Sequence, residues 1–174
     1  MPLLQKKVCL LGDFAVGKTS LVRRFVYDRF DDKYISTIGV KVSRKSLIVP
    51  HDGGTVRMNM LLWDMAGGED FSHVHASYLR GAAGAILVCD LTRAETLESM
   101  SRYAGDFWSI NPTSPLVIVG NKVDLKDMRA ITDAELQAVA ESHARSPWFT
   151  SSAKTGEHVE ELFQALGQLI LATR

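Results

Sequence analysis

The feature that most constrains the fold of this chain is an eight-residue segment near its N-terminus. The segment reads GDFAVGKT, from Gly12 to Thr19, and matches the spacing GxxxxGK[ST]. It directly follows a short apolar stretch, Val8–Leu11, and opens an amphipathic one, Lys18–Asp28. Glycines let the backbone curl until consecutive N–H groups point at phosphate oxygens, and a helix N-terminus adds positive potential. The segment therefore predicts a strand, a phosphate-binding loop and a helix, in that order.

Two side chains at the end of this segment suit a nucleoside triphosphate. Lys18 can reach the outer phosphates as a point charge, and the hydroxyl of Thr19 can ligate Mg²⁺. The plain alternative is a glycine turn with a chance lysine, but the strand before it and the helix after it argue against that interpretation. We therefore predict a nucleotide site, with the base left open by these residues alone.

The rest of the chain alternates short apolar runs with longer amphipathic stretches. We expect six strands, at Val8–Leu11, Val40–Val49, Met58–Trp63, Ala85–Cys89, Leu116–Val119 and Trp148–Thr150. We expect five helices, at Lys18–Asp28, Phe71–Leu79, Ala94–Ile110, Asp133–His143 and Val159–Leu171. The segment HDGG, from His51 to Gly54, predicts a hairpin between the second and third strands. This order predicts an α/β fold: an open, mostly parallel six-stranded sheet with one antiparallel edge strand and helices on both faces.

The composition fits one folded domain over residues 1–174. Apolar residues make up 46% and charged residues 23%, which excludes a disordered or collagen-like chain. Twenty basic residues balance twenty acidic ones, so the net charge gives no general attraction to nucleic acid, and we expect no nucleic-acid partner. Cys9 and Cys89 lie inside apolar runs and indicate buried core residues in a reducing, cytoplasmic compartment.

A second motif bears on the choice of base. The segment NKVD, from Asn121 to Asp124, directly follows a predicted strand, and Ser152-Ala-Lys154 follows the last one. A carboxylate such as that of Asp124 accepts two donors from guanine, whereas the adenine ring presents an acceptor and repels it. Hydrogen bonds to a charged group contribute about 1.5–3 kcal/mol each, so two of them discriminate by several powers of ten. By itself NKVD is also a reasonable solvated turn, but beside a phosphate loop it favours guanine.

Together these segments make the chain similar to small GTPases of the Ras superfamily, and most similar to the Rab branch. The segments that carry the resemblance, in chain order, are GDFAVGKT, YISTIGV (Tyr34–Val40), WDMAGGE (Trp63–Glu69), YLRGAAG (Tyr78–Gly84), NKVD and TSSAKTGE (Thr150–Glu157). The resemblance implies a G domain that acts as a molecular switch, binds GTP or GDP with Mg²⁺, and hydrolyses GTP to GDP and phosphate.

The resemblance also implies a role for individual residues. The metal ligands would be Thr19, Thr37 and Asp64. The residues closest to the chemistry would be Lys18, Thr37, Gly67 and Gly68. The nucleotide would contact a larger set, comprising Asp13, Phe14, Ala15, Val16, Gly17, Lys18, Thr19, Ser20, Phe30, Tyr34, Thr37, Gly67, Asn121, Lys122, Asp124, Ser152, Ala153 and Lys154. Within that set, Phe30 would pack on the edge of the guanine and Lys122 on its face.

Two residues depart from the family pattern. Gly68 stands where the family has the glutamine that orients the attacking water, and Phe14 stands where the loop residue is usually small. Both changes predict slow intrinsic hydrolysis. An alternative is a GTP-binding interaction module with negligible hydrolysis, and a third interpretation is an ATP-dependent enzyme with the same phosphate loop.

The resemblance implies three kinds of protein partner: an exchange factor, an activating protein and effectors. They would contact Thr37–Val42 and Trp63–Tyr78. We expect a monomer, with a dimer through an exposed Trp63 and Tyr78 patch as the alternative. The sequence ends at Arg174 without the cysteine-bearing tail of Rab proteins, so we expect no lipid anchor in this chain and membrane association only through a tail or partner absent here.

Overall fold

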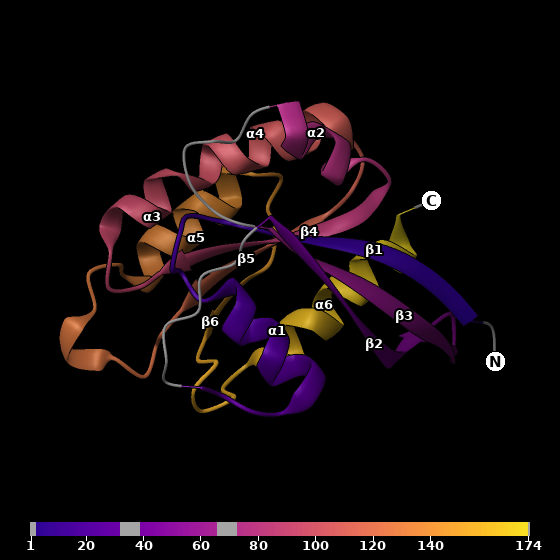
Figure 1. Ribbon diagram of the computed structural model, residues 1–174, viewed down its shortest axis with the longest axis horizontal. Helices are drawn as coiled ribbons and strands as arrows, with labels where there is room; N and C mark the ends of the chain where they lie inside the picture. Colours follow the sequence, from indigo (N-terminus) through magenta and orange to yellow (C-terminus); the bar gives the residue numbers. More distant parts are fainter. Residues whose placement is uncertain (1–2, 32–38, 66–72, 174) are drawn as a thin grey trace.

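A six-stranded sheet runs through the part of the chain that the computed structural model describes, residues 3–31, 39–65 and 73–173 (Figure 1). The strand order is β2-β3-β1-β4-β5-β6. The strands are β1 (Leu3–Leu11), β2 (Val40–His51), β3 (Gly54–Met65), β4 (Ala82–Asp90), β5 (Leu116–Asn121) and β6 (Trp148–Ser151). β2 pairs antiparallel with β3, and every other neighbouring pair is parallel. The predicted sheet with one antiparallel edge strand is confirmed, and its strands extend one to four residues beyond the predicted bounds, or five in the case of β1.

Helices cover both faces of this sheet. One face carries α1 (Lys18–Tyr27) and α6 (Val159–Ala172), and the other carries α2 (His73–Leu79), α3 (Ala94–Glu98), α4 (Met100–Ile110) and α5 (Asp133–Ser142) (Figure 1). A short 3₁₀ turn, η1, spans Lys126–Met128. None of the helices in the described ranges has the length and apolar character needed to cross a bilayer.

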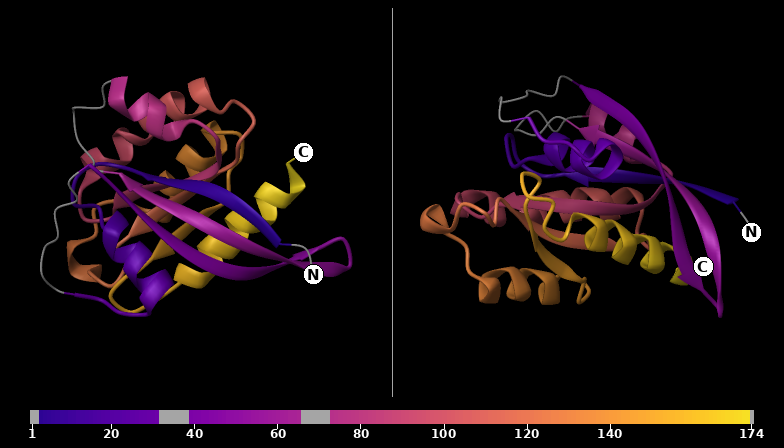
Figure 2. Two further views of the ribbon diagram at one scale, coloured as in Figure 1. Left: turned by 45° about the vertical axis from the view of Figure 1, so that its right-hand side comes forward. Right: turned by 90° about the horizontal axis from the view of Figure 1, so that it is seen from below.

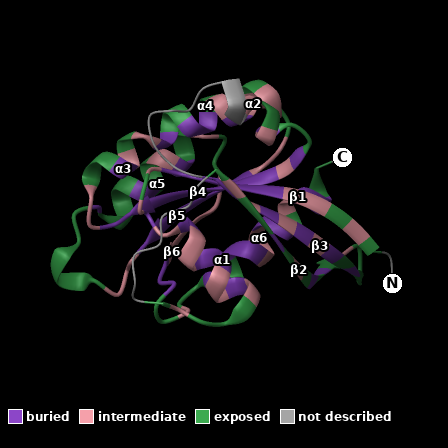
Figure 3. Ribbon diagram, viewed as in Figure 1, coloured by how far each residue is buried: buried purple, intermediate pink, exposed green. Residues whose placement is uncertain are grey.

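The burial of each strand follows from how many helices cover it. Every residue of β5 is buried and so is all but one of β4, whereas β2 and β3 alternate between buried and accessible residues (Figure 3). The central strands are covered on both faces, which explains why their sequences are continuous apolar runs. On the α1 and α6 side, the rings of Phe25 and Phe163 stack with their centroids 3.9 Å apart. The β2–β3 hairpin, turning at Asp52 and Gly53, extends along α6 toward its C-terminal end (Figure 2).

The helix predicted over Ala94–Ile110 is broken, and the prediction of one continuous helix is wrong. The break falls at Ser99, between α3 and α4. The Ser99 hydroxyl lies 3.1 Å from the carbonyl oxygen of Glu95, one turn back, and a serine that contacts this carbonyl bends a helix. The same hydroxyl lies 2.6 Å from Asp13 Oδ2, in the loop after β1. A contact with a distant loop leaves no mark in the helical periodicity.

The sheet brings the chemical motifs to one edge. β1, β3, β4, β5 and β6 are parallel to one another, so their carboxyl ends meet at the same side. There lie the loop after β1, Asp64, Asp90, the segment that begins at Asn121, and the segment after β6. This is the edge at which open α/β sheets bind ligands.

Candidate functional site

The loop between β1 and α1 requires glycine at both ends. Gly12 has φ 152°, and a Cβ atom there would lie 2.3 Å from the carbonyl oxygen of Val88. Gly17 has φ 102°, and a Cβ atom would lie 2.2 Å from Nδ2 of Asn121. Both distances are far below van der Waals contact, so the loop closes against β4 and β5 only without side chains at these positions. The spacing of the motif therefore reflects how tightly the loop is drawn to its neighbours.

Each carbonyl group of this loop accepts a hydrogen bond, either from Lys18 within the loop or from a donor elsewhere in the chain. Lys18 Nζ donates to the oxygens of Gly12 and Asp13, at 2.9 and 3.0 Å. The remaining donors are Arg93 to Phe14 at 2.9 and 3.1 Å, Lys122 to Ala15 at 3.0 Å, Asn121 to Val16 at 3.0 Å, and the N–H of Leu21 to Gly17 at 2.9 Å. Bonds that hold successive carbonyls outward leave the N–H groups for a ligand, which is the arrangement that cradles phosphate.

Lys18 is the buried cation of the site. Its residue is 6% exposed. Burial lowers the pKa of Lys18 to about 8, and the carboxylates of Asp64 and Asp13 act in the opposite direction. Its described hydrogen bonds go to neutral carbonyls, so a phosphate oxygen would stabilise the charged form more than these carbonyls do. The lysine therefore suits an anionic ligand.

Thr19 and Asp64 form an oxygen-lined corner beside this lysine. Thr19 Oγ1 donates to Asp64 Oδ2 at 2.5 Å, and Asp64 is 2% exposed near the end of β3. In the described ranges, no three His, Cys, Asp or Glu side chains gather to hold a metal by themselves. Mg²⁺ is held by oxygen ligands, commonly one or two from the protein and the rest from water and phosphates. The Thr19 and Asp64 oxygens fit such an ion when a phosphate ligand completes its shell.

The NKVD segment supplies a carboxylate that is already oriented. Asp124 Oδ1 accepts a hydrogen bond from the Ser152 hydroxyl at 2.8 Å, and that hydroxyl also accepts from the N–H of Thr155 at 3.0 Å. Ser151, one residue earlier, donates to Asn121 Oδ1 at 3.1 Å. The two loops that sequence reasoning placed around the base thus lie side by side and share hydrogen bonds.

Three residues contribute to the site that the sequence did not single out. Asp90 Oδ2, at the end of β4, lies 2.9 Å from Lys122 Nζ. Arg93 holds the carbonyl of Phe14, and Arg24 of α1 donates to the carbonyls of Ala153 and Lys154 at 2.8 and 2.6 Å. The position of Asp90 directly after a predicted strand was the available signal. The two arginines gave none, because the backbone carbonyls that they hold at this site lie far away in the chain.

The other residues predicted for the site have fewer described contacts, or lie outside the described residues. Ser20 lies in the first turn of α1, and Phe30 is partly buried against the core between the sheet and α1 and α6. The side chain of Phe14 is 50% exposed at the loop. Tyr34, Thr37, Gly67 and Gly68 lie outside the described residues.

The expected exposed patch of Trp63 and Tyr78 is not found. Both side chains are partly buried against the core, with ring centroids 6.1 Å apart. Lys7 Nζ lies 3.8 Å from the centre of the Trp63 ring and donates to the carbonyl of Arg80 at 2.8 Å. An ammonium over an aromatic face is favourable, and here it occupies surface that the prediction assigned to partners.

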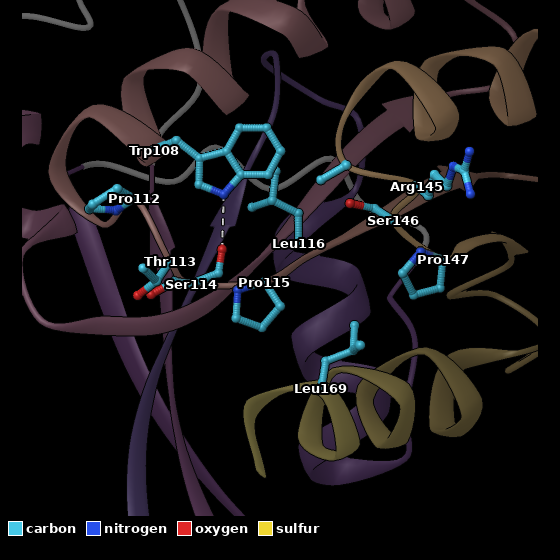
Figure 4. Close-up of a pocket in the computed structure, with 11 residues that line it drawn as sticks. Trp108, Pro112, Thr113, Ser114, Pro115, Leu116, Arg145, Ser146, Pro147 and Leu169 are labelled. Atoms are coloured by element: carbon cyan, nitrogen blue, oxygen red, sulfur yellow. Dashed lines mark hydrogen bonds between the residues drawn. The ribbon is translucent and has the colours of Figure 1, made fainter. Parts of the chain in front are cut away.

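A hollow of about 470 Å³ lies at the opposite edge of the sheet, where β5 begins (Figure 4). Its lining includes Trp108, Pro115, Arg145 and Leu169, and the Trp108 indole donates to the Ser114 carbonyl at 2.9 Å. No residue predicted for the site lines it. The polar and charged groups of the described chain that suit a nucleotide thus gather at the carboxyl edge.

Comparison with known proteins agrees with this geometry. The family model described as the Ras family matches residues 7–172. The chain is 36% identical to the Ras-related protein Rab-22A of Mus musculus over 174 residues, which cover 99% of this chain and 87% of that protein. It is 40% identical to the GTP-binding protein ypt5 of Schizosaccharomyces pombe over 167 residues, 95% of this chain and 77% of that protein. It is 37% identical to the Ras-related protein Rab-31 of Rattus norvegicus over 171 residues, 98% and 85% of the two chains.

Proposed function

The chain belongs to the Ras family of small GTPases, in the Rab branch, and from this membership we propose that it binds GTP and GDP with Mg²⁺ at the carboxyl edge described above. Members of the family are GTP-binding switches and GTP hydrolases. We further propose that residues 1–174 form a single G domain, that the nucleotide rests on Gly12–Thr19, and that Asp124 selects guanine.

One observation carries this proposal. The carbonyls of residues 12–17 all have donors, and these donors include Lys122 and Asn121 of the NKVD segment. The phosphate loop and the NKVD segment, which we call the base loop, are thus joined by hydrogen bonds. This connection supports one ligand that spans both. A nucleotide has this form, with charge at one end and a hydrogen-bonding base at the other.

The described residues account for how the chain would assist hydrolysis. Lys18 is buried beside the loop, so its ammonium and the loop N–H groups would stabilise the negative charge that grows on the phosphate oxygens during transfer to water. Thr19 and Asp64 would hold the ion, together with Thr37 as the resemblance implies. The ion held there would supply positive charge against the phosphates. Loss of the outer phosphate would release the segments around Thr37 and Gly67, which is the change a partner reads.

We propose that intrinsic hydrolysis is slow. Gly68 has no side chain to orient the attacking water. Phe14 is 50% exposed at the loop, and a ring at this position would obstruct water or a partner's arginine. If intrinsic hydrolysis is slow enough to be negligible, the protein is the GTP-binding interaction module of the alternative.

Single-turnover hydrolysis tests the slow rate. Purified protein loaded with radiolabelled GTP is compared with Gly68→Gln, and Gly53→Ala in the hairpin serves as a control remote from the site. We expect Gly68→Gln to release phosphate faster than the native chain, because it restores a water-orienting amide. A native chain that alone matches partner-stimulated GTPases would refute the slow rate. Equal, immeasurable rates in both proteins would favour the interaction module.

The choice of base is tested at Asp124. Its carboxylate is oriented by Ser152 and has no contact with the phosphate loop among those described, so Asp124→Asn leaves that loop intact. We expect GDP affinity to fall by about two to four powers of ten, since two hydrogen bonds to a charged group are lost or reversed. Affinity for xanthosine diphosphate should rise. An unchanged preference, or competition by ATP against GTP in the native chain, would support the ATP-dependent alternative.

Rab-family GTPases generally work with exchange factors, activating proteins and effectors. We propose that such partners of this chain contact Thr37–Val42 and Trp63–Tyr78. The Val42 side chain is 50% exposed on β2 and pairs across the strands with Trp63. Because Trp63 is partly covered by Lys7, the surface offered is more polar than one built on two exposed rings. A pull-down experiment tests this assignment. We expect the GTP-loaded protein to capture a partner that the GDP-loaded protein does not capture, and Val42→Asp to abolish that capture.

A further inference from the structure

Two consecutive residues of the phosphate loop are held by side chains of the segment from Arg93 to Tyr103. Asp13 Oδ2 accepts a hydrogen bond from the Ser99 hydroxyl at 2.6 Å, and Asp13 Oδ1 accepts one from the Tyr103 hydroxyl at 3.0 Å. Both Nη atoms of Arg93 donate to the carbonyl of Phe14, at 2.9 and 3.1 Å. We call Arg93, Ser99 and Tyr103 the loop clamp.

The clamp is built into the fold and does not lie loosely on its surface. Tyr103 is 1% exposed, and its ring belongs to the core formed with α4. Ser99 lies between α3 and α4, one turn before Tyr103, so both hydroxyls face the same loop residue. A hydrogen bond from a buried hydroxyl to a carboxylate is stronger than one between neutral groups.

The clamp also answers an electrostatic difficulty. A carboxylate in a phosphate-binding loop repels the ligand unless it is turned away and partly neutralised. Asp13 is held by two hydroxyls of the α3–α4 segment, and Arg102 Nη2 lies 3.7 Å from its Oδ1. The acidic side chain is thereby directed at α4, while its own carbonyl accepts from Lys18.

The clamp and the base loop divide the phosphate loop between them. The clamp holds Asp13 and Phe14, whereas Lys122 and Asn121 hold the carbonyls of the next two residues, Ala15 and Val16. Among the described contacts the two sets hold different residues of the loop, although Arg93 and Lys122 both lie near Asp90 Oδ2, at 3.9 and 2.9 Å. Loosening the clamp should therefore act mainly on Asp13 and Phe14.

We propose that the loop clamp positions the phosphate loop and sets how slowly bound nucleotide leaves it. This inference rests on the proposed function, because it requires a nucleotide on Gly12–Thr19. Arg93, Ser99 and Tyr103 are positioning residues, because their role here is carried by their contacts with the loop. Their loss acts by letting the carboxylate of Asp13 turn toward the phosphates and by freeing the carbonyl of Phe14.

Dissociation of methylanthraniloyl-GDP from the Mg²⁺-loaded protein, chased with excess GDP, tests the clamp. Tyr103→Phe removes one hydroxyl and keeps the ring, and we expect it to speed release by about ten- to a hundredfold, the value of one hydrogen bond to a charged group. Ser99→Ala and Arg93→Lys should also speed release. The matched controls are Tyr27→Phe, on the exposed end of α1, and Ser109→Ala, whose hydroxyl bonds only its own helix among the described contacts.

A double-mutant cycle separates positioning from general loss of stability. If Tyr103 acts through Asp13, Tyr103→Phe should have little effect on release in an Asp13→Ala background. Equal acceleration in both backgrounds would overturn the proposal, and so would native release rates in both Tyr103→Phe and Ser99→Ala. Absence of any binding of the analogue to the native chain would instead be a failure of the proposed function.

Discussion

Gly17 is the position at which a single methyl group should damage the site most specifically. Its φ of 102° is one that side-chain-bearing residues rarely adopt, and an added Cβ atom would lie 2.2 Å from Asn121 Nδ2. That amide donates to the carbonyl of Val16 at 3.0 Å, inside the phosphate loop. Gly17→Ala therefore strains the backbone and also displaces the amide that holds the second half of the loop.

The expected loss has two parts. The left-handed conformation costs a residue with a side chain about 1–2 kcal/mol. Displacing Asn121 leaves the buried carbonyl of Val16 without its donor, which costs about 1–3 kcal/mol. The sum is roughly 2–5 kcal/mol. Both parts fall on the closed loop, so they should appear in the free energy of unfolding of the GDP-loaded protein, measured by urea titration at a fixed excess of GDP.

Gly53→Ala is the matched control. Gly53 also has a positive φ, 76°, but a Cβ atom there would meet nothing within 4 Å. It should lose only the backbone part, about 1–2 kcal/mol. In an Asn121→Ala background the obstacle is gone, so Gly17→Ala should cost no more than Gly53→Ala. The reasoning fails if Gly17→Ala costs the same with and without the Asn121 amide, or if it never exceeds the hairpin control.

Three further outcomes follow from the burial of individual side chains. Loading nucleotide-free protein with GDP near about pH 9 should take up close to one proton, because burial lowers the pKa of Lys18 to about 8 and the diphosphate favours its charged form. GDP affinity should therefore fall as the pH rises above about 8, as calorimetry in buffers of different ionisation enthalpy would measure. Cys9 and Cys89 should resist a thiol reagent until the protein is unfolded, because burial raises the pKa of each thiol to about 12. Phe163→Ala should lower the urea-derived free energy of unfolding by about 3–5 kcal/mol, through loss of the stack on Phe25.

What the sequence could predict follows from local rules. The strand and helix periods, the hairpin at Asp52 and Gly53, and the GxxxxGK[ST] spacing all depend on residues close together in the chain. The strands ran past their predicted ends because pairing continues where apolar alternation weakens, as at Lys6 and Lys7 of β1. Because the strands that carry the motifs are parallel, the motifs were expected at one edge of the sheet.

The features that escaped prediction depend on contacts between distant residues. The hydrogen bond of Ser99, between α3 and α4, goes to Asp13, 86 positions earlier. The partial burial of Trp63 reflects the position of Lys7 on the neighbouring strand. Neither contact alters hydrophobic periodicity, so only the three-dimensional register reveals it.

Because the base loop and the phosphate loop are connected, only some variants change base recognition without changing the phosphate loop. Lys122 holds the carbonyl of Ala15 and contacts Asp90 at 2.9 Å, and Arg93, which holds Phe14, lies 3.9 Å from the same carboxylate. A change at Lys122 therefore alters both base contacts and the shape of the phosphate loop. Asp124 has its described contact with Ser152 instead. A loss of GDP affinity in Asp124→Asn can thus be assigned to the base, whereas the same loss in a Lys122 variant would combine two causes.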